Sequence, residues 1–208
     1  MLFNFVCIEG NIGIGKTTLV KKLAEHFGVF AFYEEFEENP WLPLFYENPE
    51  ETALSLELSF LTHRVKQLHK IKKEHGNKVM ISDYSLDKCL LFAQTNLPPP
   101  DFTQYKKLHE AVAKTIAQPA LVIVIHTETE NLKKNIKERN RPYEQKIGGE
   151  YLQKLNNAYK DFFKEEKPYA ILNIFTPRLD EAVYGRIFNE IVAFVKMKPF
   201  FGNTSIEL

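Results

Sequence analysis

The sequence has little cysteine, no excess of either charge and no long apolar run. Cys7 and Cys89 are the only two cysteines in 208 residues, and they form no CxxC pair, which indicates buried thiols in a reducing compartment. Basic and acidic residues both number 27, and this balance argues against a nucleic-acid partner. No apolar run approaches the ~20 residues of a transmembrane helix, and MLFNFVCIEG at the start lacks a basic leader segment. We therefore expect a cytoplasmic protein without a nucleic-acid or membrane partner.

Apolar and aromatic residues are abundant, at 44% and 13% of the chain, as is typical of a globular protein. Short apolar runs that mostly lack strict alternation predict strands buried on both faces. These runs cover residues 3–9, 29–35, 78–84, 120–126 and 169–175. Helical patterns separate them, most clearly at 17–27 and 51–75. The alternation predicts an α/β fold with a five-stranded parallel sheet flanked by helices on both faces.

The length fits one hydrophobic core, and we expect a single domain over residues 1–198. The three consecutive prolines at 98–100 are expected in a loop between helices. The last residues, 199–208, show no periodicity and are interpreted as a C-terminal tail.

A glycine-rich stretch, GNIGIGKTT, follows the first predicted strand and precedes a predicted helix. Its spacing satisfies GxxxxGK[ST], the phosphate-binding P-loop, in the context that the motif requires. Glycines let backbone N–H groups approach phosphate oxygens, and the helix directs its positive end at the same anion. Lysine reaches the β- and γ-phosphates, and the first threonine is placed to ligate Mg²⁺. The predicted ATP-binding residues are Gly10, Asn11, Ile12, Gly13, Ile14, Gly15, Lys16, Thr17 and Thr18.

The chain has no NKxD segment of a GTPase, and its size favours a small-molecule kinase. Such an enzyme needs a base for the acceptor hydroxyl and cations around the transferred phosphoryl group. Carboxylates follow the second predicted strand, at the sheet edge where ligands bind: Glu34, Glu35, Glu37 and Glu38. Most of these four are expected to be solvated.

Two further segments carry suitable charges. Arg139 and Arg141 flank a predicted helix end, which is either solvated or part of a lid that closes over phosphates. Asp83 ends the third strand, where a carboxylate can hold Mg²⁺ together with Thr17. We expect ATP as co-substrate and Mg²⁺ as cofactor.

Together with the P-loop, four segments resemble the deoxynucleoside kinase family, most closely its bacterial deoxyadenosine/deoxyguanosine kinase branch. They are EEFEENPWLPLFYENPEE, LELSFLTHRVKQL, SDYSLDKCLLFA and RNRPYEQKI followed by EYLQKLNNAY. The resemblance runs from the P-loop to about residue 165. It implies a P-loop kinase fold with a short lid at 139–147, a homodimer, and 5′-phosphorylation of a deoxynucleoside, with deoxyadenosine ranked first and deoxyguanosine second. The long helix at 51–75 is a candidate dimer element.

The resemblance also implies roles for individual residues. Glu34 matches the base that takes the 5′-hydroxyl proton, with Glu35 as the local alternative. Tyr46 and Glu144 match the pair that binds the 3′-hydroxyl. The remaining matches are base recognition by Glu57 with Arg64, base stacking by Phe92, and donor-phosphate binding by Arg139 and Arg141.

Two positions depart from the family pattern. Relatives usually carry an arginine after the third-strand carboxylate, but here Tyr84 follows Asp83, and Lys88 or a lid arginine could supply the missing charge. Most relatives have glutamine where this chain has Glu57. An ionised Glu57 would suit guanine, with Arg64 free to pair with it, whereas a protonated Glu57 regains the donor that adenine needs.

Two other functions compete with this interpretation. A nucleoside monophosphate kinase of the thymidylate kinase type would need an extra cation beside the sugar, and the acidic segment FYEEFEENP argues against it. A regulatory protein that has lost catalysis is suggested by Tyr84, whereas Lys16 and Glu34 argue for an active enzyme.

Overall fold

The computed structural model describes residues 2–36, 39–196 and 202–208. Within these residues a parallel sheet has the order β2-β3-β1-β4-β5-β6. Its strands are β1 (Phe5–Gly10), β2 (Phe30–Phe32), β3 (Met80–Ser82), β4 (Leu121–His126), β5 (Ala170–Phe175) and β6 (Asn203–Glu207). The α/β fold with a parallel sheet is thereby confirmed, and the count of five strands was wrong because the described residues form six.

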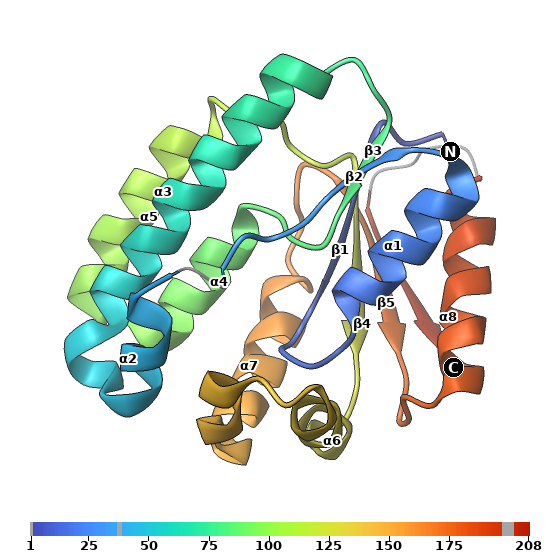
Figure 1. Ribbon diagram of the computed structural model, residues 1–208. Helices are drawn as coiled ribbons and strands as arrows, with labels where there is room; N and C mark the ends of the chain where they lie inside the picture. The colour runs from blue at the N-terminus through green and yellow to red at the C-terminus, as the bar shows by residue number, and fades with distance from the viewer. Residues whose placement is uncertain (1, 37–38, 197–201) are drawn as a thin grey trace.

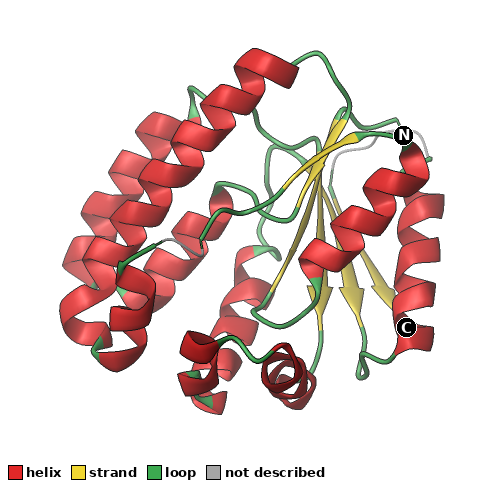
Figure 2. Cartoon of the chain, in the orientation of Figure 1, coloured by secondary structure: helices red, strands yellow, loops and turns green. Residues whose placement is uncertain are grey.

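Helices cover both faces of the sheet (Figures 1 and 2). The helices are α1 (Lys16–Phe27), α2 (Trp41–Glu47), α3 (Pro49–His75), α4 (Asp87–Asn96), α5 (Pro99–Ala113), α6 (Thr129–Arg139), α7 (Gly149–Phe162) and α8 (Glu181–Phe194). A 3₁₀ helix, η1 (Pro142–Lys146), lies within the expected lid, between α6 and α7. Figure 1 shows α1 and α8 on one side of the sheet, with α3, α4, α5 and α7 on the other. None of the helices in the described part of the chain combines the length and apolar character needed to cross a bilayer.

The central strands are buried on both faces, which explains why their sequences lack alternation. Val6 and Ile8 on β1 pack in the same apolar cluster as Leu19 of α1. Cys7 points to the opposite face, where it packs in a cluster with Leu155 of α7. Because successive side chains of a strand point to opposite faces, a run that is apolar throughout fills both layers.

The sixth strand comes from the segment interpreted as a tail. β6 pairs in parallel with β5 at the edge of the sheet. Thr204 and Ile206 are half-buried, whereas Asn203, Ser205 and Glu207 are exposed. An edge strand that buries only alternate side chains needs little apolar sequence, and this is why no apolar run predicted it.

The proline cluster also differs from the expectation. Pro99 and Pro100 belong to the first turn of α5, rather than to a loop between helices. Proline is tolerated there because the first N–H groups of a helix have no partner inside the helix.

Candidate active site

The P-loop connects β1 to α1 at the carboxyl edge of the sheet. Gly15 precedes α1 with a φ of 87°, and a Cβ atom placed there would lie 1.5 Å from the hydroxyl of Tyr184. The ammonium of Lys16 donates to the carbonyls of Gly10 and Asn11 at 2.8 and 3.0 Å. The lysine therefore folds over its own loop, beside the N-terminus of α1, as a phosphate-binding loop requires.

The Asn11 side chain ties this loop to α7. Its Nδ2 donates to the carbonyl of Leu152 at 2.8 Å and to Oδ1 of Asn156 at 2.7 Å. Its Oδ1 accepts from the backbone N–H of Ile12 at 2.7 Å. These contacts hold the loop in shape from its buried side, so Asn11 shapes the phosphate site rather than facing it.

The two expected lid arginines lie beside the P-loop, where they help to line a groove at its mouth. Gly13, Gly15, Lys16, Thr17 and Thr18 line one part of it, with Arg139 and Arg141 among the residues on the other. Ile14, the fifth residue of the loop, is buried in the core instead, and its carbonyl accepts from the hydroxyl of Tyr184.

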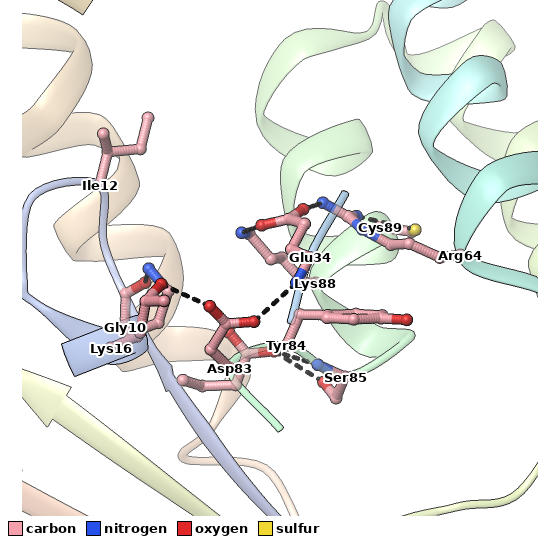
Figure 3. A network of polar contacts seen from close by, with 12 residues as sticks. Gly10, Ile12, Lys16, Glu34, Arg64, Asp83, Tyr84, Ser85, Lys88 and Cys89 are labelled. Carbon is pink, nitrogen blue, oxygen red and sulfur yellow. Dashed lines mark hydrogen bonds and ion pairs between the residues drawn. The ribbon is translucent and has the colours of Figure 1, made fainter. Parts of the chain in front are cut away.

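Asp83 joins the P-loop to the acidic segment. Its Oδ2 accepts from the Thr17 hydroxyl at 2.5 Å. Its Oδ1 accepts from the backbone N–H of Glu34 at 2.8 Å (Figure 3). Thr17 and Asp83 thus present two oxygen atoms next to the phosphate-binding loop. The described residues contain no cluster of three or more His, Cys, Asp or Glu side chains suited to a metal. Two oxygen ligands fit Mg²⁺, which keeps several waters and binds substrate phosphates.

Glu34 lies between two cations and is largely buried. Oε1 accepts from Arg64, and Oε2 accepts from Lys88 at 2.5 Å. Figure 3 shows Glu34 with Arg64 on one side and Asp83 on the other. Burial alone would raise the pKa of Glu34, but the charges of Arg64 and Lys88 outweigh it and hold this pKa well below its usual range. The carboxylate is therefore ionised.

Arg64 contacts Glu34 rather than an open part of the pocket. One terminal nitrogen donates to Glu34, and the other donates to Sγ of Cys89 at 2.9 Å. Its guanidinium also stacks over Phe60, 4.6 Å from the ring centre. A pairing of Arg64 with guanine requires this arrangement to open, since both terminal nitrogens already have partners.

One pocket, with about 790 Å³ of empty space that includes part of the adjacent solvent, extends from the P-loop to a recess beside α3 and α4. Glu57 and Phe92 line the recess, with Asn96 beside them. Asn96 Nδ2 donates to Glu57 Oε1 at 2.8 Å, and the hydroxyl of Tyr151 donates to Asn96 Oδ1 at 3.1 Å. Burial raises the pKa of Glu57 to about 7, although the Asn96 bond and nearby cations lower it in part. Glu57 is therefore poised to gain or lose its proton near neutral pH.

Glu144 contacts both of the expected lid arginines. It accepts from Nε of Arg139 at 3.0 Å and from a second nitrogen of the same guanidinium, and lies 3.5 Å from Arg141. Tyr46 lines the same pocket. Burial, followed by the charge of Glu144, raises the pKa of Tyr46, so these two residues lie near each other as the predicted sugar-binding pair requires.

Tyr84, at the position where the family resemblance implies an arginine, is fully buried, and its hydroxyl donates to Oε1 of Gln67. The amide of Gln67 also donates to Glu35, at 3.1 Å. Glu35 is exposed and outside the pocket lining, which favours Glu34 as the base. Glu37 and Glu38 lie outside the described residues.

Sequence reasoning named Lys88 and Phe92 but missed Asn96, the third residue on the face of α4 that lines the pocket. Lys88, Phe92 and Asn96 are spaced four residues apart on one helix, so their side chains point the same way. This spacing was a readable signal for Asn96. The contact of Cys89 with Arg64 had no such signal, because it joins two helices that are distant in sequence.

Three comparisons with known proteins point to one enzyme family. A sequence model described as "Deoxynucleoside kinase" matches residues 6–196. The chain is 34% identical over 201 residues to a deoxyguanosine kinase of Bacillus subtilis, covering 92% of this chain and 96% of the relative. It is 33% identical over 154 residues to a deoxyadenosine kinase of Lactobacillus acidophilus, covering 69% of this chain and 70% of the relative.

Solved structures lead to the same group. The chain is similar to a deoxyadenosine kinase of M. mycoides with bound dATP, with a TM-score of 0.77 and 26% identity. This similarity covers 93% of the chain and 100% of the neighbour. The same enzyme with bound dCTP gives a TM-score of 0.74 at 26% identity, covering 91% of the chain and 99% of the neighbour.

Proposed function

The chain belongs to the deoxynucleoside kinase family, and from that premise we propose that it transfers the γ-phosphoryl group of ATP to the 5′-hydroxyl of a purine deoxynucleoside. The products are the deoxynucleoside monophosphate and ADP, in a salvage reaction. One observation carries the proposal: contacts run from Thr17 through Asp83 to Glu34, in a pocket whose far end holds Glu57. Phosphate-binding, proton-accepting and base-recognising groups thus share one cavity.

On the acceptor side, Glu34 takes the proton of the 5′-hydroxyl as its oxygen attacks the γ-phosphorus. The bond between that phosphorus and the bridging oxygen of ADP breaks at the same centre. Tyr46 and Glu144 bind the sugar 3′-hydroxyl, and this contact fixes the 5′-oxygen near Glu34. Positioning of this kind supplies much of the catalysis in phosphoryl transfer, because the chemistry itself asks little of the protein.

On the donor side, the P-loop N–H groups and Lys16 bind the phosphates of ATP. Arg139 and Arg141, now beside Glu144 at the mouth of the loop, meet the donor phosphates when the lid closes. Thr17 and Asp83 would hold Mg²⁺, which when bound would supply positive charge that offsets the negative charge of the phosphates.

We infer a purine from the recess around Glu57. Phe92 offers a ring for stacking, and Glu57 offers polar atoms to the edge of the base. Protonated Glu57 presents one donor and one acceptor, as the N1 and 6-amino groups of adenine require. Ionised Glu57 only accepts, which suits the N1–H and 2-amino groups of guanine. We rank deoxyadenosine first and deoxyguanosine second; relatives named for each of these purines support the choice of a purine, and the order rests on the sequence resemblance.

The nucleoside monophosphate kinase alternative requires a cation that meets an acceptor phosphate. Arg64 is engaged with Glu34 and Cys89, and Arg139 with Glu144, which argues against such a site. Family membership argues in the same direction, and also against a regulatory protein without catalysis.

The deciding experiment measures ADP formation from ATP and Mg²⁺ with a panel of acceptors. The panel contains the four natural deoxynucleosides, their monophosphates, and a reaction without acceptor. Stimulation by purine deoxynucleosides, with the 5′-monophosphate as product by mass spectrometry, supports the proposal. Stimulation by monophosphates alone supports the nucleoside monophosphate kinase alternative. If no acceptor stimulates ADP formation, the result supports a regulatory protein without catalysis.

We also propose a homodimer that forms through α3. Leu54 and Leu58 lie four residues apart on this helix and are both exposed. Exposed leucines in such a row are typical of helices that pair. Light scattering of wild type and of Leu54→Glu tests this: the wild type is expected as a dimer and the variant as a monomer.

A further inference from the structure

The reacting centre lacks a cation where the family pattern places one. Position 84 is a tyrosine, and its hydroxyl donates to Gln67 on α3. A neutral phenol that is fully buried cannot neutralise a phosphoryl group. Phosphoryl transfer concentrates negative charge on the equatorial oxygens, so a second cation beside the P-loop lysine is expected to come from elsewhere.

Lys88, on the first turn of α4, occupies a suitable place. Its ammonium is 2.5 Å from Oε2 of Glu34 and 5.6 Å from the ring centre of Phe92. The side chain is largely buried and lines the pocket together with Lys16 and Asp83. Lys88 therefore stands between the proposed base and the proposed stacking residue, where the sugar and its 5′-oxygen would lie.

Other cations of the pocket are engaged differently. Arg64 uses both terminal nitrogens on Glu34 and Cys89, and Arg139 makes two contacts with Glu144. Lys16 donates to carbonyls of its own loop. An ammonium has three N–H donors, and among the described residues one side-chain acceptor, Glu34, is within hydrogen-bond distance of Lys88.

Lys88 decides the balance of charge around Glu34. The carboxyl groups of Glu9, Glu34 and Asp83 lie among three cations, those of Lys16, Arg64 and Lys88. Burial lowers the pKa of Lys16 to about 8, and the charge of Lys88 is the next cause, so the two ammonium groups act on the same region. Without Lys88 the three carboxyl groups would outnumber the two remaining cations, and the cluster would disfavour a phosphoryl group.

We propose that Lys88 supplies the cation that position 84 lacks, orienting the Glu34 carboxylate toward the 5′-hydroxyl and stabilising the oxygens of the transferred phosphoryl group. The inference rests on the proposed kinase reaction. The proton of the hydroxyl goes to Glu34, the oxygen–phosphorus bond forms, and the bond to ADP breaks. Lys88 keeps its own protons throughout and changes partner from Glu34 to phosphoryl oxygen.

The test compares three substitutions of one residue. Lys88→Met removes the charge, Lys88→Gln keeps a donor for Glu34 without the charge, and Lys88→Arg keeps the charge. We expect Met and Gln to lower kcat by about 10²–10³, while KM for the deoxynucleoside changes a few-fold. Arg is expected to stay within about tenfold of wild type, because charge is what the site requires. Lys107→Met, an exposed lysine of α5, is the matched control and should behave as wild type.

Chemical rescue separates charge from structure. Lys88→Ala leaves a space that methylammonium or ethylammonium can fill, and added amine should restore kcat at least about tenfold. The same amine at the same ionic strength should leave wild type and Lys107→Met unchanged. Thermal melting shows which variants fold. If Lys88→Met does not fold, the kcat of Lys88→Gln decides the test.

Wild-type kcat in folded Lys88→Gln would overturn the inference, as would equal losses in Lys88→Gln and Lys88→Arg without rescue in Lys88→Ala. Failure of the proposed function looks different: wild type itself would then give no deoxynucleoside-dependent ADP. Since that comparison uses unaltered protein, the two failures are distinguishable.

Discussion

Asn96 donates to one oxygen of Glu57 at 2.8 Å, while the other carboxyl oxygen, Oε2, is buried without a hydrogen-bond partner among the described residues. A buried polar atom without a partner costs free energy, which a bound base can recover. Burial also raises the pKa of this carboxyl to about 7. The unpaired oxygen therefore changes between donor and acceptor close to neutral pH.

The first prediction concerns this proton. Below a pKa of about 7, Glu57 carries the proton and can donate to N1 of adenine; above it, the ionised group repels that nitrogen. The kcat/KM for deoxyadenosine should therefore fall as pH rises through about 7. In Glu57→Gln the amide does not titrate, so deoxyadenosine use should be kept or raised, with this pH dependence removed.

Controls distinguish the two protonation states. Glu51→Gln changes an exposed carboxylate of the same helix and should leave the profile unaltered. If Glu57 works ionised, Glu57→Gln loses deoxyguanosine specifically and deoxyadenosine use is insensitive to its titration. Thymidine as the best wild-type substrate would contradict the purine assignment.

The fold was predictable because burial leaves a direct mark on sequence. Strands covered on both faces, such as β1 and β4, are apolar along most of their length, and the P-loop marks the turn after β1. β6 buries only alternate side chains of a polar pentapeptide, so it left no comparable mark. Its place depends on the open edge of β5, which is a property of the assembled sheet.

The site was predictable where one motif fixes several residues, and less so where partners come from separate elements. GxxxxGKT places Lys16 and Thr17 without knowledge of the rest of the chain. The contact between Arg64 and Glu34 could not be predicted from the sequence, because Glu34 lies in a loop thirty residues away. The raised pKa of Glu57 depends on burial by several helices, which local sequence does not encode.

The second prediction tests the base and the phosphate clamp. Glu34→Gln and Lys16→Ala should each lower kcat by about 10²–10⁴, since one removes a general base and the other a charge on the phosphates. Glu34→Gln should keep nucleoside binding by calorimetry, because its amide still hydrogen-bonds the hydroxyl. Removing the charge of Glu34 from its buried ion pair with Arg64 also destabilises the folded protein, so the melting temperature of Glu34→Gln is expected to fall.

Glu35→Gln is the matched control for the base, because Glu35 neighbours Glu34 but is exposed. It should retain wild-type kcat. Near-wild-type kcat in Glu34→Gln together with a large loss in Glu35→Gln would transfer the role of base to Glu35.

The third prediction concerns the sugar. If Tyr46 and Glu144 bind the 3′-hydroxyl, a 2′,3′-dideoxynucleoside leaves buried polar groups unpaired, at about 1–3 kcal/mol each. Its kcat/KM should be at least about tenfold below that of the deoxynucleoside. Tyr46→Phe should reduce the difference in kcat/KM between the two substrates, because it removes one of the two groups that the dideoxynucleoside leaves unpaired. Equal use of both substrates by wild type would refute the assignment.

The last prediction concerns the metal. Thr17 and Asp83 offer two oxygen atoms that contact each other beside the P-loop, and removing either should weaken Mg²⁺ binding at least about tenfold. Activity should require Mg²⁺, vanish with a chelator and return when the metal is restored. Thr17→Val and Asp83→Asn should need higher Mg²⁺ for half-maximal rate, whereas Thr17→Ser, which keeps the hydroxyl, should stay near wild type. Thr62→Val, an exposed threonine of α3, controls for loss of a hydroxyl elsewhere. An unchanged Mg²⁺ dependence in both Thr17→Val and Asp83→Asn would show that the metal is held by other groups.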